Sequence, residues 1–194
     1  MKTVRLTLMI LTVALVSCSG IGSSIKLSDA SSTANIEKIL SESFDGDAEV
    51  YDFTLYAGIL EDELKNINRI YKHKNTFFWQ EYYVSSGGFD DPIKKVDAPY
   101  LKKTPFKISD IDVSIIPVKY QEALALLKEK ELFDENKTYY LNNWVFTSDR
   151  DGAIISTFTI QYRVGSVSTG RQTEITYDDF SFSVNSSNEL KQIN

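Results

Sequence analysis

The chain has little of the chemistry on which enzymes and metalloproteins usually depend. Its 194 residues include one histidine, His73, and one cysteine, Cys18. Histidine is the usual acid–base group near neutral pH, and zinc sites need clusters of histidine and cysteine. His73 lies between Lys72 and Lys74, which favours a solvated turn residue. We therefore predict no catalytic residue, no metal site and no bound cofactor. A lone cysteine also excludes an internal disulfide.

The acidic stretches do not complete a calcium site. Asp45, Asp47 and Glu49 alternate as in an EF-hand loop, but Val50 stands where the loop needs glycine and Tyr56 where it needs glutamate. A hydrolase that uses dispersed carboxylates is the alternative function, because distant acids can meet in a cleft. A carboxylate pair about 5–9 Å apart in such a cleft would favour it.

Basic residues are outnumbered, with 21 lysines and arginines against 27 acids and a formal net charge of −6. An acidic chain repels phosphate backbones, so nucleic acid is excluded as a partner. The composition is 42% hydrophobic and includes 11 phenylalanines, 11 tyrosines and 2 tryptophans. A chain with this many apolar side chains to bury folds, so we expect a globular body.

The first 17 residues have the pattern of an export signal. Lys2 and Arg5 precede an apolar run from Leu6 to Val16, and no acid is present. As a helix this run would be about 16 Å long, too short to cross a hydrocarbon core of about 30 Å. Removal of residues 1–17 takes the formal net charge from −6 to −8, since both cations are lost.

The end of this segment, Leu15-Val16-Ser17-Cys18, resembles the lipobox of bacterial lipoproteins. The resemblance covers only about the first 20 residues. It implies a diacylglyceryl group on the Cys18 sulfur, cleavage before Cys18 and an N-acyl group on the new amino terminus. It also implies a lipid anchor in the cell envelope, and Ser19, in place of aspartate, favours the outer membrane by family analogy. An ordinary secretory signal with a free Cys18 is the alternative.

The mature chain divides into a tether and a folded body. Residues 18–33 are rich in serine and glycine and predict a flexible tether, followed by a body over 34–194. Residues 59–72 are ambiguous between helix and strand, and the spacing of their apolar residues favours a helix. The expected elements are a helix from Thr33 or Asn35, strands at 50–56 and 76–84, a helix at 59–72, a strand at 111–117, a helix at 118–133, and strands at 138–147, 153–165 and 172–184.

This order predicts an α+β fold, with an antiparallel meander and helices packed on one face. A helix, a Phe-Asp pair, a polar turn and an aromatic strand occur near Phe44 and again near Phe133, which indicates a duplicated unit. The layout resembles cystatin-like and nuclear-transport-factor-like domains. Two subdomains could meet near the loop at 85–106. A parity switch at Asp178-Asp179 predicts a β-bulge.

Aromatic side chains supply the candidate binding residues. Trp79, Tyr82, Tyr83 and Trp144 lie in aromatic strands, and alternation places Trp79 and Tyr83 on one face and Tyr82 on the other. Exposed aromatics are typical of protein or glycan binding, and core packing is the alternative. We expect a non-enzymatic binding or assembly role at the envelope, with a protein or a glycan as partner. An exposed sheet edge would favour assembly.

Overall fold

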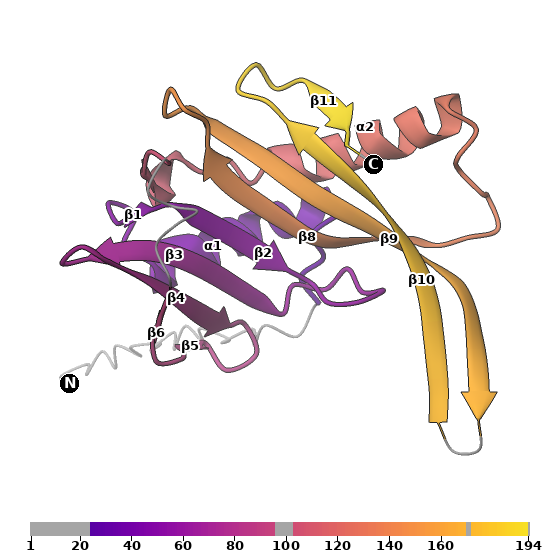
Figure 1. Cartoon of the computed structure of the whole chain (residues 1–194), viewed down its shortest axis with the longest axis horizontal. Helices are drawn as coiled ribbons and strands as arrows, with labels where there is room; N and C mark the ends of the chain where they lie inside the picture. Colours follow the sequence, from indigo (N-terminus) through magenta and orange to yellow (C-terminus); the bar gives the residue numbers. More distant parts are fainter. Residues whose placement is uncertain (1–23, 96–102, 170–171, 194) are drawn as a thin grey trace, which may run out of the picture.

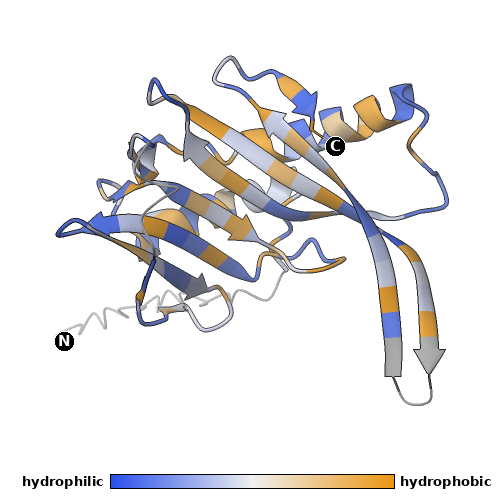
Figure 2. Ribbon diagram, viewed as in Figure 1, coloured by the Kyte–Doolittle hydropathy of each residue, from blue (hydrophilic) through white to orange (hydrophobic). Residues whose placement is uncertain are grey.

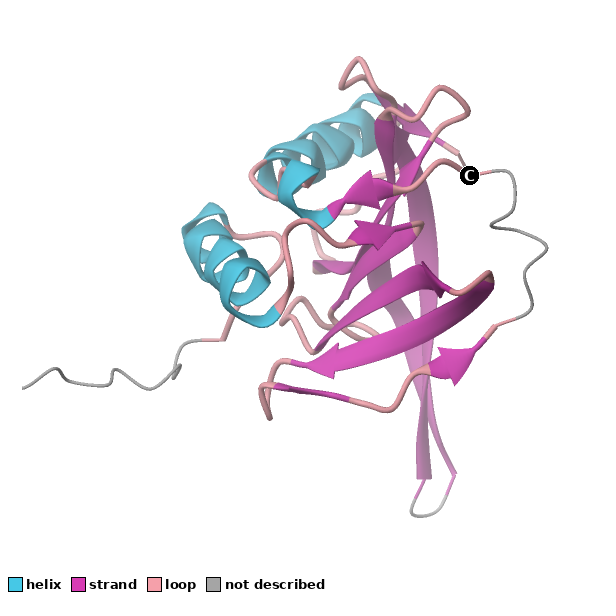
Figure 3. Cartoon of the chain, turned by 90° about the vertical axis from the view of Figure 1, so that its left-hand side faces the viewer, coloured by secondary structure: helices cyan, strands magenta, loops and turns pink. Residues whose placement is uncertain are grey.

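The computed structural model describes residues 24–95, 103–169 and 172–193. The predicted signal segment, the lipobox and Cys18 therefore lie outside the described residues. Within these ranges, two α-helices cover one face of a nine-stranded antiparallel sheet (Figures 1 and 3). The predicted α+β class, with a sheet meander and helices on one face, is confirmed.

The helices are α1 (Thr33–Ser43) and α2 (Ile115–Glu129), with short 3-10 turns at Ala30–Ser32 and Ile108–Asp110. The strands are β1 (Glu49–Val50), β2 (Asp52–Tyr56), β3 (Asn66–His73), β4 (Thr76–Tyr83), β5 (Gly88–Phe89), β6 (Ile93–Lys94), β7 (Phe106–Lys107), β8 (Tyr139–Ser148), β9 (Ile154–Thr169), β10 (Gln172–Val184) and β11 (Leu190–Gln192). The main sheet has the order β11-β10-β9-β8-β2-β3-β4-β5, and β6 also pairs with β4. Strands β1 and β7 form a separate pair.

The order of elements repeats. Helix α1 is followed by the meander β2-β3-β4, and α2 is followed by β8-β9-β10. The two halves join where β2 pairs antiparallel with β8, so one sheet and one core run through both. The repeated helix-then-strands order agrees with the layout expected from sequence.

The core lies between the sheet and the two helices. Alternate residues of the central strands point toward the helices, and Phe53, Trp144 and Phe158 are at most 1% exposed. The Trp144 and Phe158 rings stack at 4.5 Å, and Phe158 stacks on Phe182 at 5.1 Å. Burying an apolar side chain of this size contributes roughly 1.5–3 kcal/mol, so this stack is a main source of stability.

The predicted tether ends earlier than expected. Ile25 is 3% exposed and Leu27 is 1% exposed, so residues 24–33 pack as part of the body. The Leu27 N–H donates to the Asp62 carbonyl at 2.9 Å, and the backbones of Lys26 and Glu63 form an isolated antiparallel β-bridge. The Ser/Gly composition hid these alternating apolar residues, which are sufficient to dock the segment on the loop before β3.

Residues 59–72 do not form the predicted helix. They contain a turn, in which Leu60 has φ 54°, and most of strand β3. Ile67 faces the helices, whereas Ile70 is buried on the opposite face of the sheet. The helical spacing of the apolar residues was fortuitous. β-Branched Ile67 and Ile70 suit a strand, and Asn66 and Asn68 are poor helix formers.

The predicted strand at 111–117 is also wrong, because helix α2 already begins at Ile115. Pro117 lies in its first turn, where a missing backbone N–H costs nothing. The helix ends at Glu129 rather than 133. Glu131 has φ 58°, and the Leu132 N–H donates to the Leu127 carbonyl at 2.9 Å, which closes the helix with a left-handed cap.

The bulge between β9 and β10 lies away from the predicted position. Side chains alternate without interruption through Asp178-Asp179, and the register shifts between Thr176 and Tyr177. Thr176 lies opposite Gly165 and Tyr177 opposite Arg163, so Val164 on β9 is the extra residue. Beyond this bulge the two strands project from the body as a long ribbon (Figure 1). We call this ribbon, residues 163–169 and 172–177, the arm.

Candidate functional site

The four predicted binding residues have three different environments. Trp144 is fully buried in the core, where it packs on Phe158, and it offers no surface to a partner. Trp79 and Tyr83 are half-buried on the sheet face opposite the helices, and the Lys95 ammonium lies 5.3 Å from the Trp79 ring. Tyr82 points to the helix side, as alternation predicted, and is 6% exposed. The structure therefore brings Tyr82 and Tyr83 to one end of β4 and separates them from Trp144.

Tyr82 borders a pocket of about 690 Å³ at the end of the sheet, where α1 meets β3 and β4. We call it the edge pocket. Its lining combines apolar and polar side chains, among them Ile25, Ile39, Tyr82, Glu63, Lys65 and Asn66. The Tyr82 hydroxyl accepts a hydrogen bond from the Ser43 hydroxyl of α1 at 2.9 Å. This bond fixes the aromatic wall of the pocket to the helix.

A hydrogen-bonded group, which we call the Tyr83 cluster, lies beside the edge pocket. The Asn66 amide donates to Glu81 Oε1 at 2.6 Å. The Tyr83 hydroxyl lies 2.9 Å from both Glu81 Oε2 and Asp90 Oδ2, and the two carboxylates share its single proton as acceptors. These bonds, that to Asp90 first and that to Glu81 second, raise the pKa of Tyr83 to about 12. Asn66 also lines the pocket and is the residue that the two share, although Tyr83 lies on the sheet face opposite Tyr82.

Arg69 lies near this site, on the helix side of the sheet. Its guanidinium is 4.9 Å from the Tyr71 ring, 5.0 Å from Phe89 and 5.8 Å from Phe44. Its Nη2 donates to Gln80 Oε1 at 2.7 Å. Burial lowers the pKa of Arg69, but a guanidinium remains charged throughout the physiological range. The cation holds the loop that carries Phe89, and with it Asp90, against the sheet.

The sequence did not indicate Asn66, Glu81 or Arg69 as functional residues. Asn66 pairs with Tyr83 across β3 and β4, and Asn68 pairs with Glu81, so the cluster depends on this register. The segment that contains Asn66 and Arg69 was expected to be helical. A strand prediction for β3, followed by the hairpin turn at Lys74 and Asn75, would have supplied the register and the contact.

The site is rich in hydrogen-bonding groups. Asp90 is exposed to solvent, and His73 is exposed at the end of β3. Among the described residues, no three side chains of histidine, cysteine, aspartate or glutamate gather to hold a metal ion.

Comparison with known proteins found no relative of this chain. No family model, no curated protein and no solved structure matches the chain. In the part of the chain that the structure describes, neither helix is long and apolar enough to cross a bilayer. Any function must therefore be argued from the N-terminal pattern and from the edge pocket with its Tyr83 cluster.

Proposed function

We propose that this chain is a lipid-anchored protein of the bacterial envelope, with a non-enzymatic binding role and an envelope glycan as its ligand. The lipobox pattern ending at Cys18 supports the anchor. The observation that carries the ligand is the edge pocket of about 690 Å³, joined through Asn66 to the Tyr83 cluster. Pockets that bind small ligands combine apolar walls with a few placed polar groups, as this one does.

The chemistry of the lining suits a sugar. Sugars present neighbouring hydroxyls at their edges and apolar C–H groups on their faces. Asn66 and Glu63 offer amide and carboxylate groups to hydroxyls, while Ile39 and Tyr82 offer apolar surface to a ring. Such a ligand would exchange its hydrogen bonds to water for bonds of similar strength in the site.

The charge of the pocket disfavours an anionic ligand. Lys65 is its cation, and the Lys65 ammonium lies 3.0 Å from the Glu61 carboxylate and 3.9 Å from that of Glu63. Two carboxylates beside one ammonium leave no excess positive charge for a phosphate. An uncharged, hydroxyl-rich ligand is therefore the better match for the lining.

The anchor would hold the pocket close to the membrane. Ser24 lines the edge pocket, and Cys18 precedes it by six residues. Six residues span at most about 20 Å when fully extended. A lipid on Cys18 would therefore keep the site near the bilayer surface, where it meets glycans of the envelope.

Binding can be tested with purified peptidoglycan sacculi and with soluble fragments prepared from them. We expect Asn66→Ala to weaken binding at least tenfold, because it removes a polar group shared by pocket and cluster. Asn143→Ala is the matched control, since Asn143 lies on β8 in the same sheet but does not line the pocket. Equal binding by wild type and Asn66→Ala, or no binding by wild type, would reject the glycan proposal.

The anchor is tested separately with Cys18→Ser. Wild type should incorporate a labelled fatty acid and sediment with membranes, whereas Cys18→Ser should do neither. Stable anchoring needs two or more acyl chains, each buried methylene adding about 0.8 kcal/mol. A Cys18→Ser protein that keeps its label and its membrane association contradicts the lipoprotein proposal and leaves the glycan test unaffected.

A hydrolase acting on the same ligand is the second candidate. It is favoured by one observation, the two carboxylates of Glu81 and Asp90 that share the Tyr83 hydroxyl. This candidate predicts that wild type releases reducing ends from sacculi and that Glu81→Gln and Asp90→Asn abolish the release. Binding without release favours the non-enzymatic role.

A further inference from the structure

The arm leaves strand edges unpaired. Pairing of β8 with β9 ends at Tyr139 and Tyr162, and beyond that point the described part of β9 pairs only with β10. The arm also carries exposed apolar side chains, with Val164 47%, Val167 63% and Ile175 47% exposed. Hydrophobic positions are visible in orange on both strands of the arm (Figure 2). A two-stranded ribbon is marginally stable in water, and an open edge is a template for another strand. Both properties point to a partner.

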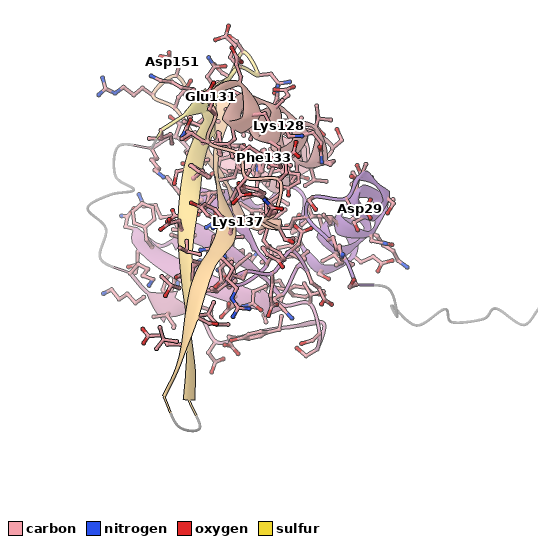
Figure 4. The ribbon with its side chains drawn as sticks, turned by 90° about the vertical axis from the view of Figure 1, so that its right-hand side faces the viewer. Asp29, Lys128, Glu131, Phe133, Lys137 and Asp151 are labelled. Atoms are coloured by element: carbon pink, nitrogen blue, oxygen red, sulfur yellow. The ribbon has the colours of Figure 1, made fainter. Side chains whose placement is uncertain are left out.

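Aromatic packing holds the base of the arm in a fixed direction. Tyr139 stacks on Phe133 at 4.6 Å and contacts Tyr162 at 5.3 Å, and Tyr162 stacks on Phe180 at 5.6 Å. The Lys137 ammonium lies 4.8 Å from the ring of Tyr162, the last residue of β9 that pairs with β8. Figure 4 shows Lys137 and Phe133 on the body, above the projecting arm. The arm therefore projects from a packed base and is not the frayed end of a sheet.

Charge distinguishes the two edges of the arm. On β9, Arg163 stands at the base of the arm and residues 164–169 carry no charge, whereas β10 carries Glu174 in the arm and Asp178 and Asp179 just below it. The whole chain has a formal net charge of −6, so two copies repel one another. Contact through β10 would bring the acids of both copies together. Contact through β9 would place all of them on the outer strands, as far apart as the assembly allows.

We infer that the free edge of β9 pairs antiparallel with the same edge of a second copy, which forms a dimer about a twofold axis. Such a contact is closed, because each edge uses the other and none is left open. The pairing also brings Val164 and Val167 of the two copies into one four-stranded ribbon. Natural edges are protected by lysine or proline, and residues 164–169 contain neither. The dimer does not depend on the ligand of the edge pocket.

The first test compares lysine on the two edges, in the full chain, by analytical ultracentrifugation in detergent. Ser166→Lys places like charges on facing strands of the dimer and should weaken it about tenfold. Thr176→Lys is the matched control, since Thr176 lies on β10 opposite Gly165, the neighbour of Ser166. It should change the dimer about twofold or less. A wild type that is monomeric up to about 1 mM, or a stronger loss with Thr176→Lys, overturns the inference.

Cysteine crosslinking in membranes tests the geometry. Ser166→Cys should give disulfide-linked dimers on oxidation, whereas wild type should give none, because the lipid on Cys18 leaves it no free thiol. Thr176→Cys should give none, because β10 strands of the two copies would lie about 14 Å apart and a disulfide needs Cα atoms within about 7 Å. Equal crosslinking at both positions, or none at Ser166→Cys, contradicts β9 pairing. Circular dichroism of each variant checks that the body is folded.

Discussion

The hairpin of β9 and β10 passes through two environments. In its first part, Phe158, Ile160 and Phe182 are at most 1% exposed and pack under the helices. In the arm, the same two strands continue their pairing with both faces in solvent. The ladder of backbone hydrogen bonds is common to both parts, and apolar burial belongs to only one. Backbone pairing therefore extends β9 and β10 beyond the body, whereas the stability of the fold comes from the helix-covered part.

The largest effect should come from truncating the buried part. Phe158→Ala removes a ring that stacks on both Trp144 and Phe182, and it should lower the free energy of unfolding by about 3–5 kcal/mol. Val167→Ala in the arm should cost less than about 0.5 kcal/mol, because Val167 is exposed. Urea denaturation at low protein concentration measures both. A cost above about 1.5 kcal/mol for Val167→Ala would mean that the arm is packed even in dilute solution.

Two glycines at opposite ends of β9 sharpen the contrast. Gly152 has φ 87°, and a Cβ there would lie 3.2 Å from Thr104 Cγ2, whereas a Cβ at Gly165 meets nothing within 4 Å. We expect Gly152→Ala to cost about 1–2 kcal/mol through backbone strain. Gly165→Ala should be neutral or stabilise by up to about 1 kcal/mol. Urea denaturation measures the change in free energy of unfolding for both variants. An equal loss of stability at the two positions would mean that the arm and the helix-covered part respond alike to the substitution.

Shortening the arm should leave the body intact. Replacing residues 164–176 by Asn-Gly closes the hairpin with a two-residue turn next to the Arg163–Tyr177 pair. The free energy of unfolding should stay within about 1 kcal/mol of wild type, because the described residues among those removed pair only with one another. Thermal unfolding followed by circular dichroism measures this change. Loss of cooperative unfolding would show that the arm contributes to the body.

The smallest effect is expected from a buried carboxylate. Burial raises the pKa of Asp52, and Lys103 and Thr54 offset part of this rise. A raised folded-state pKa means that the folded state binds the proton more tightly. The free energy of unfolding should therefore fall as pH rises through the folded pKa. Asp52→Asn keeps the hydrogen bond from Thr54 and should flatten this slope.

Glu174→Gln is the control for Asp52→Asn, because Glu174 is exposed in the arm. The pH dependence of urea unfolding should be unchanged in this variant. Asp62, whose pKa burial also raises, keeps part of the slope in both proteins. An unchanged slope in Asp52→Asn would show that Lys103 compensates the burial completely.

Much of the fold follows from local patterns in the sequence. Helix α1 and strand β4 have clear periods, and the alternation in β4 correctly placed Trp79 and Tyr83 on one face and Tyr82 on the other. The segment around β3 failed because four apolar residues matched a helical period while β-branched residues and tertiary pairing favoured a strand. Because residues 59–72 were predicted as a helix, the strand register that brings Asn66 to Glu81 could not be predicted.

The burial of Trp144 and the freedom of the arm were harder to predict. Both depend on how far along each strand the helices cover the sheet. Alternation of apolar residues identifies a strand but does not show where this cover ends. Trp144 lies under this cover, whereas Val164 and Ile175 lie beyond it. The sequence indicates strands in all three places. Only the packed base at Tyr139 and Tyr162 marks the point where burial stops.

The length of the arm sets how far from the body a contact can be made, and this length can change independently of the core. Beyond Tyr162 the described parts of its strands pair only with each other, so inserting two residues in each strand would lengthen it by about 7 Å without altering the core. Insertions in pairs would keep every side chain on its present face, whereas a single insertion would exchange the faces. Mutation and selection can thus tune how far from the body a contact is made, independently of how stably the body folds.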